Sequence, residues 1–421
     1  MFIMAPGTEH SELKNQRISK NAALYLCAIA FYYISSGAFS LLQGIYIKEL
    51  HIGETFLGSL LSLRILATAL FSIPGAMIVN KYGKKKGILL GICFVPVTSL
   101  FQGYFENKLL ILIFATLQGC AMSFLMVSEG PFFMENGTEK NRLKLFSYSF
   151  ADNVFATMLG YFIFGHVSGK LNTFLGSVIS LRYSIITASL MGMIGCIFAF
   201  LLKENNSVVY KNTGNFYKDS LNILKQKKPS KFLIYNFIIG FGAGLVVPYF
   251  NVYLKYKVNI TTEQIGIIMS LSMAAMGIGG LITPIMARRY GKVKTIITCQ
   301  IVSIPFLMLI AMPPSIIIVS LALFIRNALM NMTGPIVNNM AMELVQGNER
   351  SIFASMNNIS NNLSMALSAV IAGIIMNHLA NGYEIPYFIT AIMYFIATLY
   401  FYKYFKTFEK VDTLVSAPKQ I

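Results

Sequence analysis

Four ionisable side chains lie inside long apolar stretches of this 421-residue chain: Arg64, Glu129, Asp152 and Arg326. A charged group is rare at such positions, because its transfer from water into an apolar medium costs free energy. A carboxylate held there is suited to carrying a proton, since the loss of water favours its neutral form. A guanidinium held there attracts a carboxylate or a phosphate. These residue types therefore indicate proton exchange and anion binding within an apolar environment.

The depth of each group, counted at ~1.5 Å per helical residue, separates their roles. Asp152 lies deeper in its stretch than Glu129, which is close to one end. We predict proton coupling for both, with Asp152 first, and the alternative for Glu129 is an ion pair at the level of a gate. Arg326 lies near the middle of its stretch and Arg64 in the outer third, and both are candidates for binding the solute. The alternative for Arg326 is a structural pairing with backbone carbonyls or a neighbouring helix.

Polar side chains also follow one face of each of two apolar stretches, at helical spacing. The candidates for solute binding among them are Asn327, Asn331, Asn357 and Asn361. Such a stripe either joins helices by side-chain hydrogen bonds or lines a water-filled path. Tyr32 and Tyr33, in the middle of the first apolar stretch, are further candidates because their rings can stack on a solute. The alternative for these tyrosines is packing or contact with lipid.

Long apolar helices must position these residues. The chain is 55% hydrophobic and only 12% charged, which excludes a soluble enzyme. Its apolar stretches fall at 22–47, 56–79, 87–104, 109–131, 146–169, 181–202, 232–256, 264–287, 293–312, 314–337, 352–377 and 383–405. Because a helix of about 20 apolar residues crosses a bilayer, we predict an all-α membrane protein with twelve transmembrane helices. The first stretch is too long for the core of a signal peptide, so we expect it to be retained.

The basic residues are distributed unequally between the two sides of these predicted spans. The net charge is +17, and 26 of the 34 lysines and arginines fall on the side of the N-terminus. Six fall on the other side, and two lie inside spans. Positive residues concentrate on the cytoplasmic side of membrane proteins, so we predict a multi-pass protein of the plasma (inner) membrane with both termini in the cytoplasm. The basic balance is therefore topological, and no nucleic-acid partner is expected.

The two halves of the chain resemble each other at an offset of 208 residues. Residues 56–86 match 264–294 at eight positions without a gap, and the same offset recurs from Glu135/Glu343 to Gly165/Gly373. Two blocks at one offset indicate a duplicated six-helix unit. The predicted divisions are a cytoplasmic N-terminal tail at 1–21, a six-helix bundle at 22–202, a cytoplasmic linker at 203–231, a second six-helix bundle at 232–405 and a cytoplasmic C-terminal tail at 406–421.

The duplicated loops carry a further set of candidates. Glycine is needed for positive φ in the tight turn after each second helix, and carboxylates at helix ends can pair with the basic loops at roughly 1 kcal/mol each. Such weak pairs suit a gate, and the alternative is a set of lysines that only anchors the topology. The candidates for gating are Asn80, Gly83, Lys84, Glu135, Arg142, Gly291, Lys292, Glu343 and Arg350.

These motifs resemble those of the major facilitator superfamily, in its general bacterial branch, over nearly the whole chain. The loop at 75–86 resembles the signature loop, the Glu-x6-Arg segments resemble its companion motif, and 240–250 resembles its seventh span. Asn80 and Arg288 stand where the family has an aspartate, which alters its charge relay. Proton-driven drug exporters of this family typically have an arginine before the Gln-Gly of the fourth span and a Gly-Pro motif in the fifth span. This chain lacks the arginine before Gln118 and lacks the Gly-Pro motif.

The resemblance implies two six-helix bundles that rock about a central site. We expect a secondary transporter that exports a small organic solute by proton antiport; the alternative is proton-coupled uptake of an organic anion or zwitterion. A third hypothesis is a transport-inactive sensor or scaffold. The expected partners are the lipid bilayer, the solute and protons, and we expect a monomer. The five cysteines and four histidines form no metal or catalytic motif, so no enzyme activity, cofactor or metal is predicted.

Overall fold

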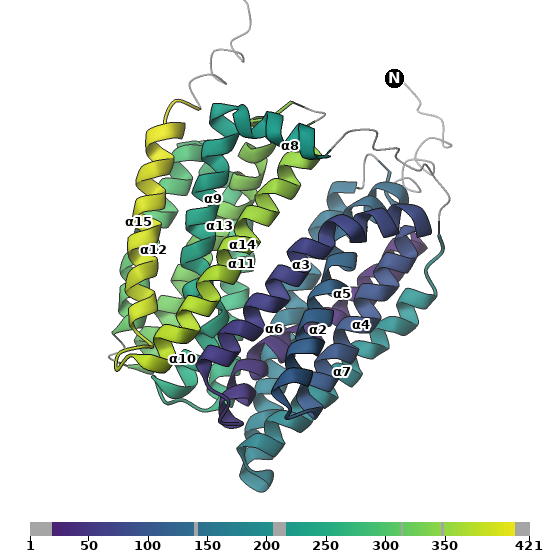
Figure 1. Cartoon of the computed structure of the whole chain (residues 1–421), viewed down its shortest axis with the longest axis vertical. Coiled ribbons are helices and arrows are strands. Elements are labelled where there is room, and N and C mark those ends of the chain that lie inside the picture. The colour runs from purple at the N-terminus through teal and green to yellow at the C-terminus, as the bar shows by residue number, and fades with distance from the viewer. Residues whose placement is uncertain (1–18, 139–141, 205–215, 313–314, 347–348, 409–421) are drawn as a thin grey trace, which may run out of the picture. The chain divides into compact units, whose positions relative to one another are not determined.

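The computed structural model describes residues 19–138, 142–204, 216–312, 315–346 and 349–408. Within these ranges every regular element is a helix, which confirms the predicted all-α class (Figure 1). The elements are α2 (Lys20–Glu49), α3 (Glu54–Tyr82), α4 (Lys84–Tyr104), α5 (Lys108–Asn136), α6 (Arg142–Leu175), α7 (Ser177–Phe200), α8 (Phe216–Lys225), α9 (Lys227–Val246), η1 (Val247–Tyr249), α10 (Phe250–Tyr256), α11 (Thr262–Tyr290), α12 (Lys292–Ala311), α13 (Ile316–Glu343), α14 (Arg350–His378) and α15 (Ile385–Phe405).

Among the described residues, 11 helical segments are long and apolar enough to cross a membrane. The segment Lys227–Tyr256 counts as one of them, although it is divided into α9, η1 and α10. Pro248 lies at this division, and proline interrupts a helix because it has no N–H to donate. The one predicted span that is not among the 11 segments is the fifth, at 146–169, which lies in α6. This helix is long but carries the polar residues Asp152, Asn153 and His166.

The helix bounds repeat at the predicted offset. The helices α3 and α11 each contain 29 residues and end at Tyr82 and Tyr290, which are 208 residues apart. The helices α4 and α12 both begin two residues later, after Gly83 and Gly291. These glycines have φ of 101° and 86°, the positive values that the sequence predicts for the turns. The duplication is therefore visible in the helices as well as in the sequence.

The chain forms two compact units. Unit 1 contains Met1–Tyr46 and Leu70–Lys211, and unit 2 contains Ile47–Ala69 and Asn212–Ile421. The first part of α3 is thus packed in unit 2 and its second part in unit 1. Of the predicted linker at 203–231, residues 205–215 lie outside the described part, and the rest includes α8 and the first turn of α9. The domain limits drawn from the sequence remain predictions.

Unit 1 is held together by close helix packing. The helix α4 lies against α5 and α7, and α6 lies against α7. The helices α2 and α6 approach closely where both lack a side chain: a Cβ on Gly37 would lie 2.7 Å from the Thr157 carbonyl oxygen, and one on Gly160 would meet the Ile34 carbonyl oxygen. Small residues at such crossings let backbones meet, as in other membrane helices.

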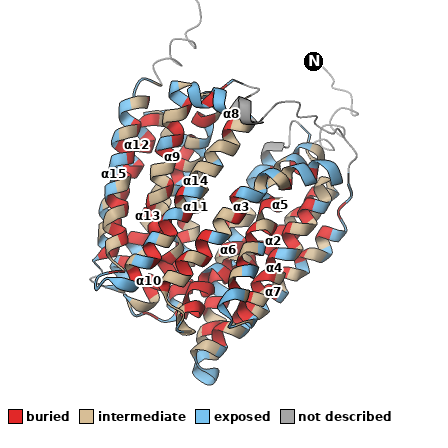
Figure 2. Ribbon diagram, viewed as in Figure 1, coloured by how far each residue is buried: buried red, intermediate tan, exposed pale blue. Residues whose placement is uncertain are grey.

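Unit 2 has its own core. The helix α9 packs against α14 and α15, and α13 packs against α11 and α12. Ring pairs such as Phe232 with Phe405 and Tyr235 with Phe401 fill the core at one end of the unit. The short helix α8 contacts α9 and α14 there and buries Ile223 in the same core. Figure 2 shows buried and exposed positions alternating along the helices of both units.

Candidate functional site

Unit 1 brings the two predicted carboxylates onto neighbouring helices. Glu129 lies on α5, and its carboxylate accepts a hydrogen bond from the Ser149 hydroxyl of α6. Asp152 lies one turn beyond Ser149 on α6 and is partly buried. Its Oδ2 atom is buried and has no hydrogen-bond partner. The carboxylate that the sequence ranks first for proton coupling therefore has an unsatisfied acceptor inside the unit.

The predicted tyrosines of α2 lie beside this pair. The rings of Tyr32 and Tyr33 meet edge to face with centroids 5.2 Å apart. The Tyr33 hydroxyl is close enough to Glu129 and Asp152 for both carboxylates to act on it electrostatically. Tyr32 is buried, with 4% of its surface exposed. Four predicted site residues from α2, α5 and α6 thus form one cluster, which we call the acidic cluster: Tyr32, Tyr33, Glu129 and Asp152.

Unit 2 holds Arg326 in an aromatic environment. The side chain is 3% exposed. Its Nη1 donates to Asn327 Oδ1 at 2.8 Å, and its Nη2 donates to the Tyr394 hydroxyl at 3.0 Å. The guanidinium lies 5.3 Å from the centre of the Phe250 ring and 5.9 Å from that of Tyr394. No carboxylate of the described residues lies within 4.0 Å of it.

Other solute-binding candidates of unit 2 lie outside this aromatic environment. Asn331 is exposed, and its amide donates to the Asn327 carbonyl oxygen one turn earlier on α13 at 2.8 Å. Arg64 lies in the part of α3 that belongs to unit 2 and is partly buried. Asn327 is therefore the candidate that the structure joins directly to Arg326.

The polar stripe of α14 faces α9. Asn357 accepts a hydrogen bond from the Asn236 amide of α9. Asn361 lies against Gly240, where a Cβ would come within 2.9 Å of its amide nitrogen. Ser364 and Ser368 continue this contact toward Gly240 and Gly244. Of the two alternatives for this stripe, the contacts favour the joining of helices, and a solute-binding role for Asn357 and Asn361 remains a prediction.

The first duplicated loop is held by two carboxylates. Lys84 forms an ion pair with Glu135 at the end of α5. Glu204 accepts hydrogen bonds from the backbone N–H groups of Lys84 and Lys85 at 2.8 and 3.0 Å, which places a negative charge at the positive end of α4. Asn80 is exposed. The sequence predicted that helix-end carboxylates such as Glu135 can pair with the basic loops, and it missed Glu204, a single acidic residue at the start of a Lys-rich segment.

The second loop repeats the ion pair. The Lys292 ammonium donates to both carboxylate oxygens of Glu343 at 2.7 Å. The expected pairing of helix-end carboxylates with the basic loops is therefore present in both copies. Arg350 donates from Nε to the Met342 carbonyl oxygen at 3.0 Å, instead of pairing with Glu343. The side chain of Arg142, its counterpart in the first copy, lies outside the described atoms.

Removing the second ion pair is expected to have a small effect on stability. Both side chains are about one third exposed, so Glu343→Gln should lower the free energy of unfolding by roughly 0.5 kcal/mol. The double exchange Lys292→Glu with Glu343→Lys should restore the loss, because it also places each charge favourably at its helix end. Thermal unfolding of the wild type and the two variants at low and high salt measures this. If Glu343→Gln lowered the free energy of unfolding by more than about 2 kcal/mol, the pair would be too strong for the weak, reversible contact that a gate requires.

Unit 2 also contains a charged cluster that the sequence did not predict. Lys48 forms an ion pair with Glu54 and donates to the Tyr383 hydroxyl, which in turn donates to Glu54. The Lys48 ammonium also lies 4.2 Å from the centre of the Tyr256 ring. The Tyr256 hydroxyl donates to Glu49 at 2.7 Å. This cluster fastens the 47–69 segment to the rest of unit 2, and no local pattern marks it because its members lie up to 335 residues apart.

Burial and the neighbouring Glu54 carboxylate raise the pKa of Tyr383 well above its ordinary value, so its hydroxyl stays protonated and able to donate. Tyr383→Phe removes that hydroxyl and should weaken the attachment of residues 47–69 by about 1–2 kcal/mol. Amide hydrogen exchange in this segment is expected to rise, whereas Tyr402→Phe, at an exposed tyrosine of the same unit, should change nothing. Unchanged exchange in the Tyr383 variant would show that the hydroxyl does not hold the segment.

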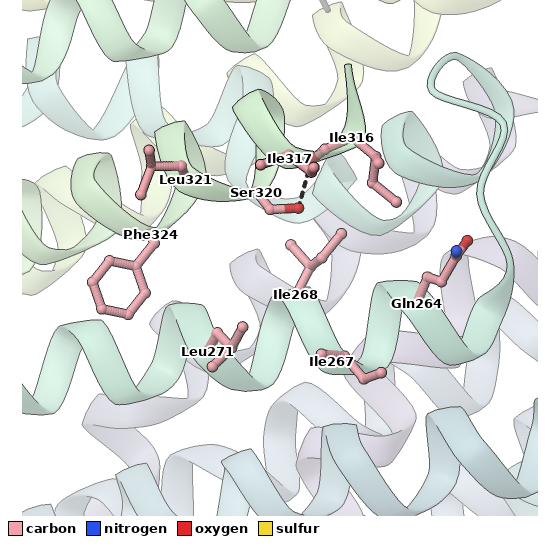
Figure 3. Close-up of a pocket in the computed structure, with 9 residues that line it drawn as sticks. All are labelled: Gln264, Ile267, Ile268, Leu271, Ile316, Ile317, Ser320, Leu321 and Phe324. Carbon is pink, nitrogen blue, oxygen red and sulfur yellow. Dashed lines mark hydrogen bonds between the residues drawn. The ribbon is translucent and has the colours of Figure 1, made fainter.

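The structure also has an apolar pocket of about 510 Å³ between α11 and α13 (Figure 3). The side chains that line it are Gln264, Ile267, Ile268, Leu271, Ile316, Ile317, Ser320, Leu321 and Phe324. The Ser320 hydroxyl is occupied, since it donates to the Ile316 carbonyl oxygen at 2.6 Å. None of the predicted site residues lines this pocket, and its walls hold no charge for a polar solute.

Comparison with known sequences gives a family and two relatives. The family model described as Major Facilitator Superfamily matches residues 24–228 and 232–419. Multidrug resistance protein 2 of Bacillus subtilis (strain 168) is 23% identical over 264 residues, which are 61% of this chain and 64% of that protein, so the match spans less than two thirds of it. Multidrug resistance protein 1 of the same organism is 22% identical over 347 residues, 78% of this chain and 83% of that protein.

Solved structures share the fold at low identity. The nucleoside transporter NupG superposes with a TM-score of 0.76 at 14% identity and covers 92% of this chain and 99% of its own. A D-xylose-proton symporter superposes with a TM-score of 0.73 at 12% identity and covers 91% of this chain and 97% of its own. At such identity these likenesses establish the fold alone.

Proposed function

Because the chain belongs to the Major Facilitator Superfamily, we propose that it exports a small organic solute by proton antiport, through alternating access. It is a multi-pass membrane transporter rather than an enzyme. The observation that carries the coupling proposal is the buried Asp152 Oδ2 atom, which has no hydrogen-bond partner. Such an oxygen is costly when charged, and a bound proton removes that cost.

The acidic cluster supplies the proton site. Asp152 takes and releases the proton, and Glu129 beside it, held by Ser149, is the second carboxylate of the coupling. The two carboxylates differ in how readily they take a proton. A carboxylate that already accepts a hydrogen bond, as Glu129 does, is more stable when charged. If the solute binds only when Asp152 has released its proton, solute and proton exchange with each other, which is the minimal requirement of antiport.

The proposed solute-binding residues are assigned within each unit. In unit 2, Arg326, Arg64, Asn327 and Asn331 bind polar groups of the solute, and Asn357 and Asn361 border them. In unit 1, Tyr32 and Tyr33 contact an apolar part of the solute. The loop residues described above act as weak locks that break and re-form when access alternates. Export is favoured by the two relatives that are described as multidrug resistance proteins.

The proposed location is the plasma (inner) membrane with both termini in the cytoplasm. The support is the distribution of the lysines and arginines, 26 of 34 of which lie on the side of the N-terminus. The proposed active form is the monomer, since one chain contains both copies of the six-helix unit.

Proton-coupled uptake of an organic anion or zwitterion is the alternative. This coupling is compatible with the fold, since one protein that shares the fold is described as a D-xylose-proton symporter. The same carboxylates serve in either direction, so only the sign of the coupling separates the two functions.

Flux in proteoliposomes tests the proposal. Purified protein is reconstituted, and uptake of radiolabelled organic anions, zwitterions and cations is measured with the lumen acidic, neutral or alkaline. Antiport concentrates a solute in the acidic compartment and symport in the alkaline one, whichever way the protein is inserted. We expect accumulation in acidic lumens. Accumulation in alkaline lumens would establish the alternative, and no gradient-dependent uptake for any solute would refute proton coupling.

A further inference from the structure

Arg326 carries a buried charge that the second half of the chain does not neutralise. Residues 232–405 contain four carboxylates, Glu263, Glu343, Glu349 and Glu384, and each lies at a helix end. Arg326 is ten residues from the start of α13, about 15 Å along the helix, and farther from its end. Partners elsewhere hold several of these carboxylates, since Glu343 pairs with Lys292, Glu384 pairs with Lys257, and Glu349 accepts from Gln226.

Two buried donors near Arg326 lack acceptors. Its Nε atom is buried and has no hydrogen-bond partner, while Nη1 and Nη2 are both used. The Tyr387 hydroxyl of α15 is also buried without a partner, and its ring is 0% exposed. The Phe250 ring lies close to both residues, since its centre is 6.2 Å from that of the Tyr387 ring and 5.3 Å from the Arg326 guanidinium. Buried donors without acceptors are rare in folded proteins, because each costs the free energy of its lost hydration.

The rings around Arg326 compensate only part of the charge. Phe250 and Tyr394 place the negative faces of their rings toward the guanidinium, and such contacts are weaker than an ion pair in a dry site. A buried water molecule would satisfy Nε and the Tyr387 hydroxyl, but it would leave the net charge unchanged. An anion satisfies both donors and the charge together.

We propose that Arg326 and Tyr387 form a binding site for a small monovalent anion, which accepts hydrogen bonds from Arg326 Nε and the Tyr387 hydroxyl. The anionic group is a carboxylate of the transported solute or an inorganic ion such as chloride, which share this chemistry. The first source rests on the proposed function, whereas the site itself does not. Arg326 supplies the charge, and Tyr387 selects for an anion that can accept from a phenol.

Anion-dependent stability tests the site without transport. Thermal unfolding of the purified full-length protein is measured at constant ionic strength while gluconate, a large anion, is replaced by chloride, formate or acetate. We expect the unfolding temperature to rise in a saturable manner with at least one small anion. Arg326→Met should abolish the rise, and Tyr387→Phe should weaken the apparent affinity about tenfold through the loss of one hydrogen bond to a charged group.

Matched variants keep the test decisive. Arg182→Met, which removes an arginine already paired with Glu106, should leave the anion response unchanged. Tyr387→Phe removes a single buried hydroxyl and is expected to fold even where Arg326→Met does not. The proposal is overturned if no small anion stabilises the wild-type protein, or if Tyr387→Phe retains the full wild-type affinity.

The same assay identifies the source of the anion. Stabilisation by chloride that no transported solute displaces indicates an inorganic ion, and displacement by carboxylate solutes indicates the solute. Binding that survives in Asp152→Asn, together with lost gradient-driven flux, separates this site from the proton site. A failed flux experiment would therefore refute the proposed function and leave the anion site standing.

Discussion

Asp152→Asn is expected to abolish transport driven by a pH gradient. Asparagine has nearly the shape of aspartic acid but cannot release a proton, so it fixes the site in one charge state. Since the Oδ2 atom of Asp152 is buried without a donor, the neutral amide should also be tolerated by the fold. Uptake into acid-loaded proteoliposomes should fall to the level of protein-free liposomes, whereas exchange of labelled for unlabelled solute without a gradient should continue.

Two further carboxylate variants show whether the loss is specific. Glu129→Gln should reduce gradient-driven uptake only in part, because Glu129 already has a donor in Ser149. Glu106→Gln, at a largely exposed carboxylate that pairs with Arg182, should transport normally. Full gradient-driven uptake by the Asp152 variant would remove Asp152 from the coupling mechanism.

Gly160→Ala is expected to destabilise unit 1 strongly although it adds one methyl group. The new Cβ would meet the Ile34 carbonyl oxygen and lie 3.0 Å from the Ile34 carbonyl carbon and 3.1 Å from the Ala38 nitrogen. All of these are backbone atoms of α2, so they can yield only if the whole helix moves. The expected loss is about 2–3 kcal/mol, measured as a lower denaturation midpoint and as earlier aggregation in detergent.

Gly130→Ala provides the matched control. Gly130 lies within α5, and a Cβ built there would have nothing within 4 Å. Alanine is the better helix former by roughly 1 kcal/mol, so this variant should be unchanged or slightly more stable. The two substitutions add the same methyl group, but only Gly160→Ala should lower the free energy of unfolding. Equal effects would show that helix propensity, and not the approach of α2 to α6, governs the response at Gly160.

The sequence alone determined the helical architecture and the duplication. The backbone N–H and C=O groups of a long apolar stretch find hydrogen-bond partners within a helix, because lipid offers the backbone no hydrogen bonds. The repeat at 208 residues identified equivalent loops in the two halves, and it predicted the positive φ of Gly83 and Gly291 and the pairing of helix-end carboxylates with these loops. These features were predictable because each depends on local spacing or on one internal comparison.

The sequence also located the ionisable residues, but it did not reveal their partners. Asp152 and Glu129 were identifiable as costly groups in apolar stretches, whereas their proximity follows from the packing of α5 against α6. The aromatic environment of Arg326 comes from residues up to 76 positions away, since Phe250 and Tyr394 lie on α10 and α15. Such partners leave no periodic signal.

Only the tertiary structure decided which helix faces meet. In a membrane protein both the packed and the lipid-facing sides of a helix are apolar, so the hydrophobic pattern does not point to the core. For this reason the sequence left open whether the stripe at Asn357 and Asn361 joins helices, and the contact with α9 resolved its orientation. The attachment of residues 47–69 to unit 2 through Tyr383 was equally invisible, because hydrogen bonds between distant segments exist only once the helices have packed.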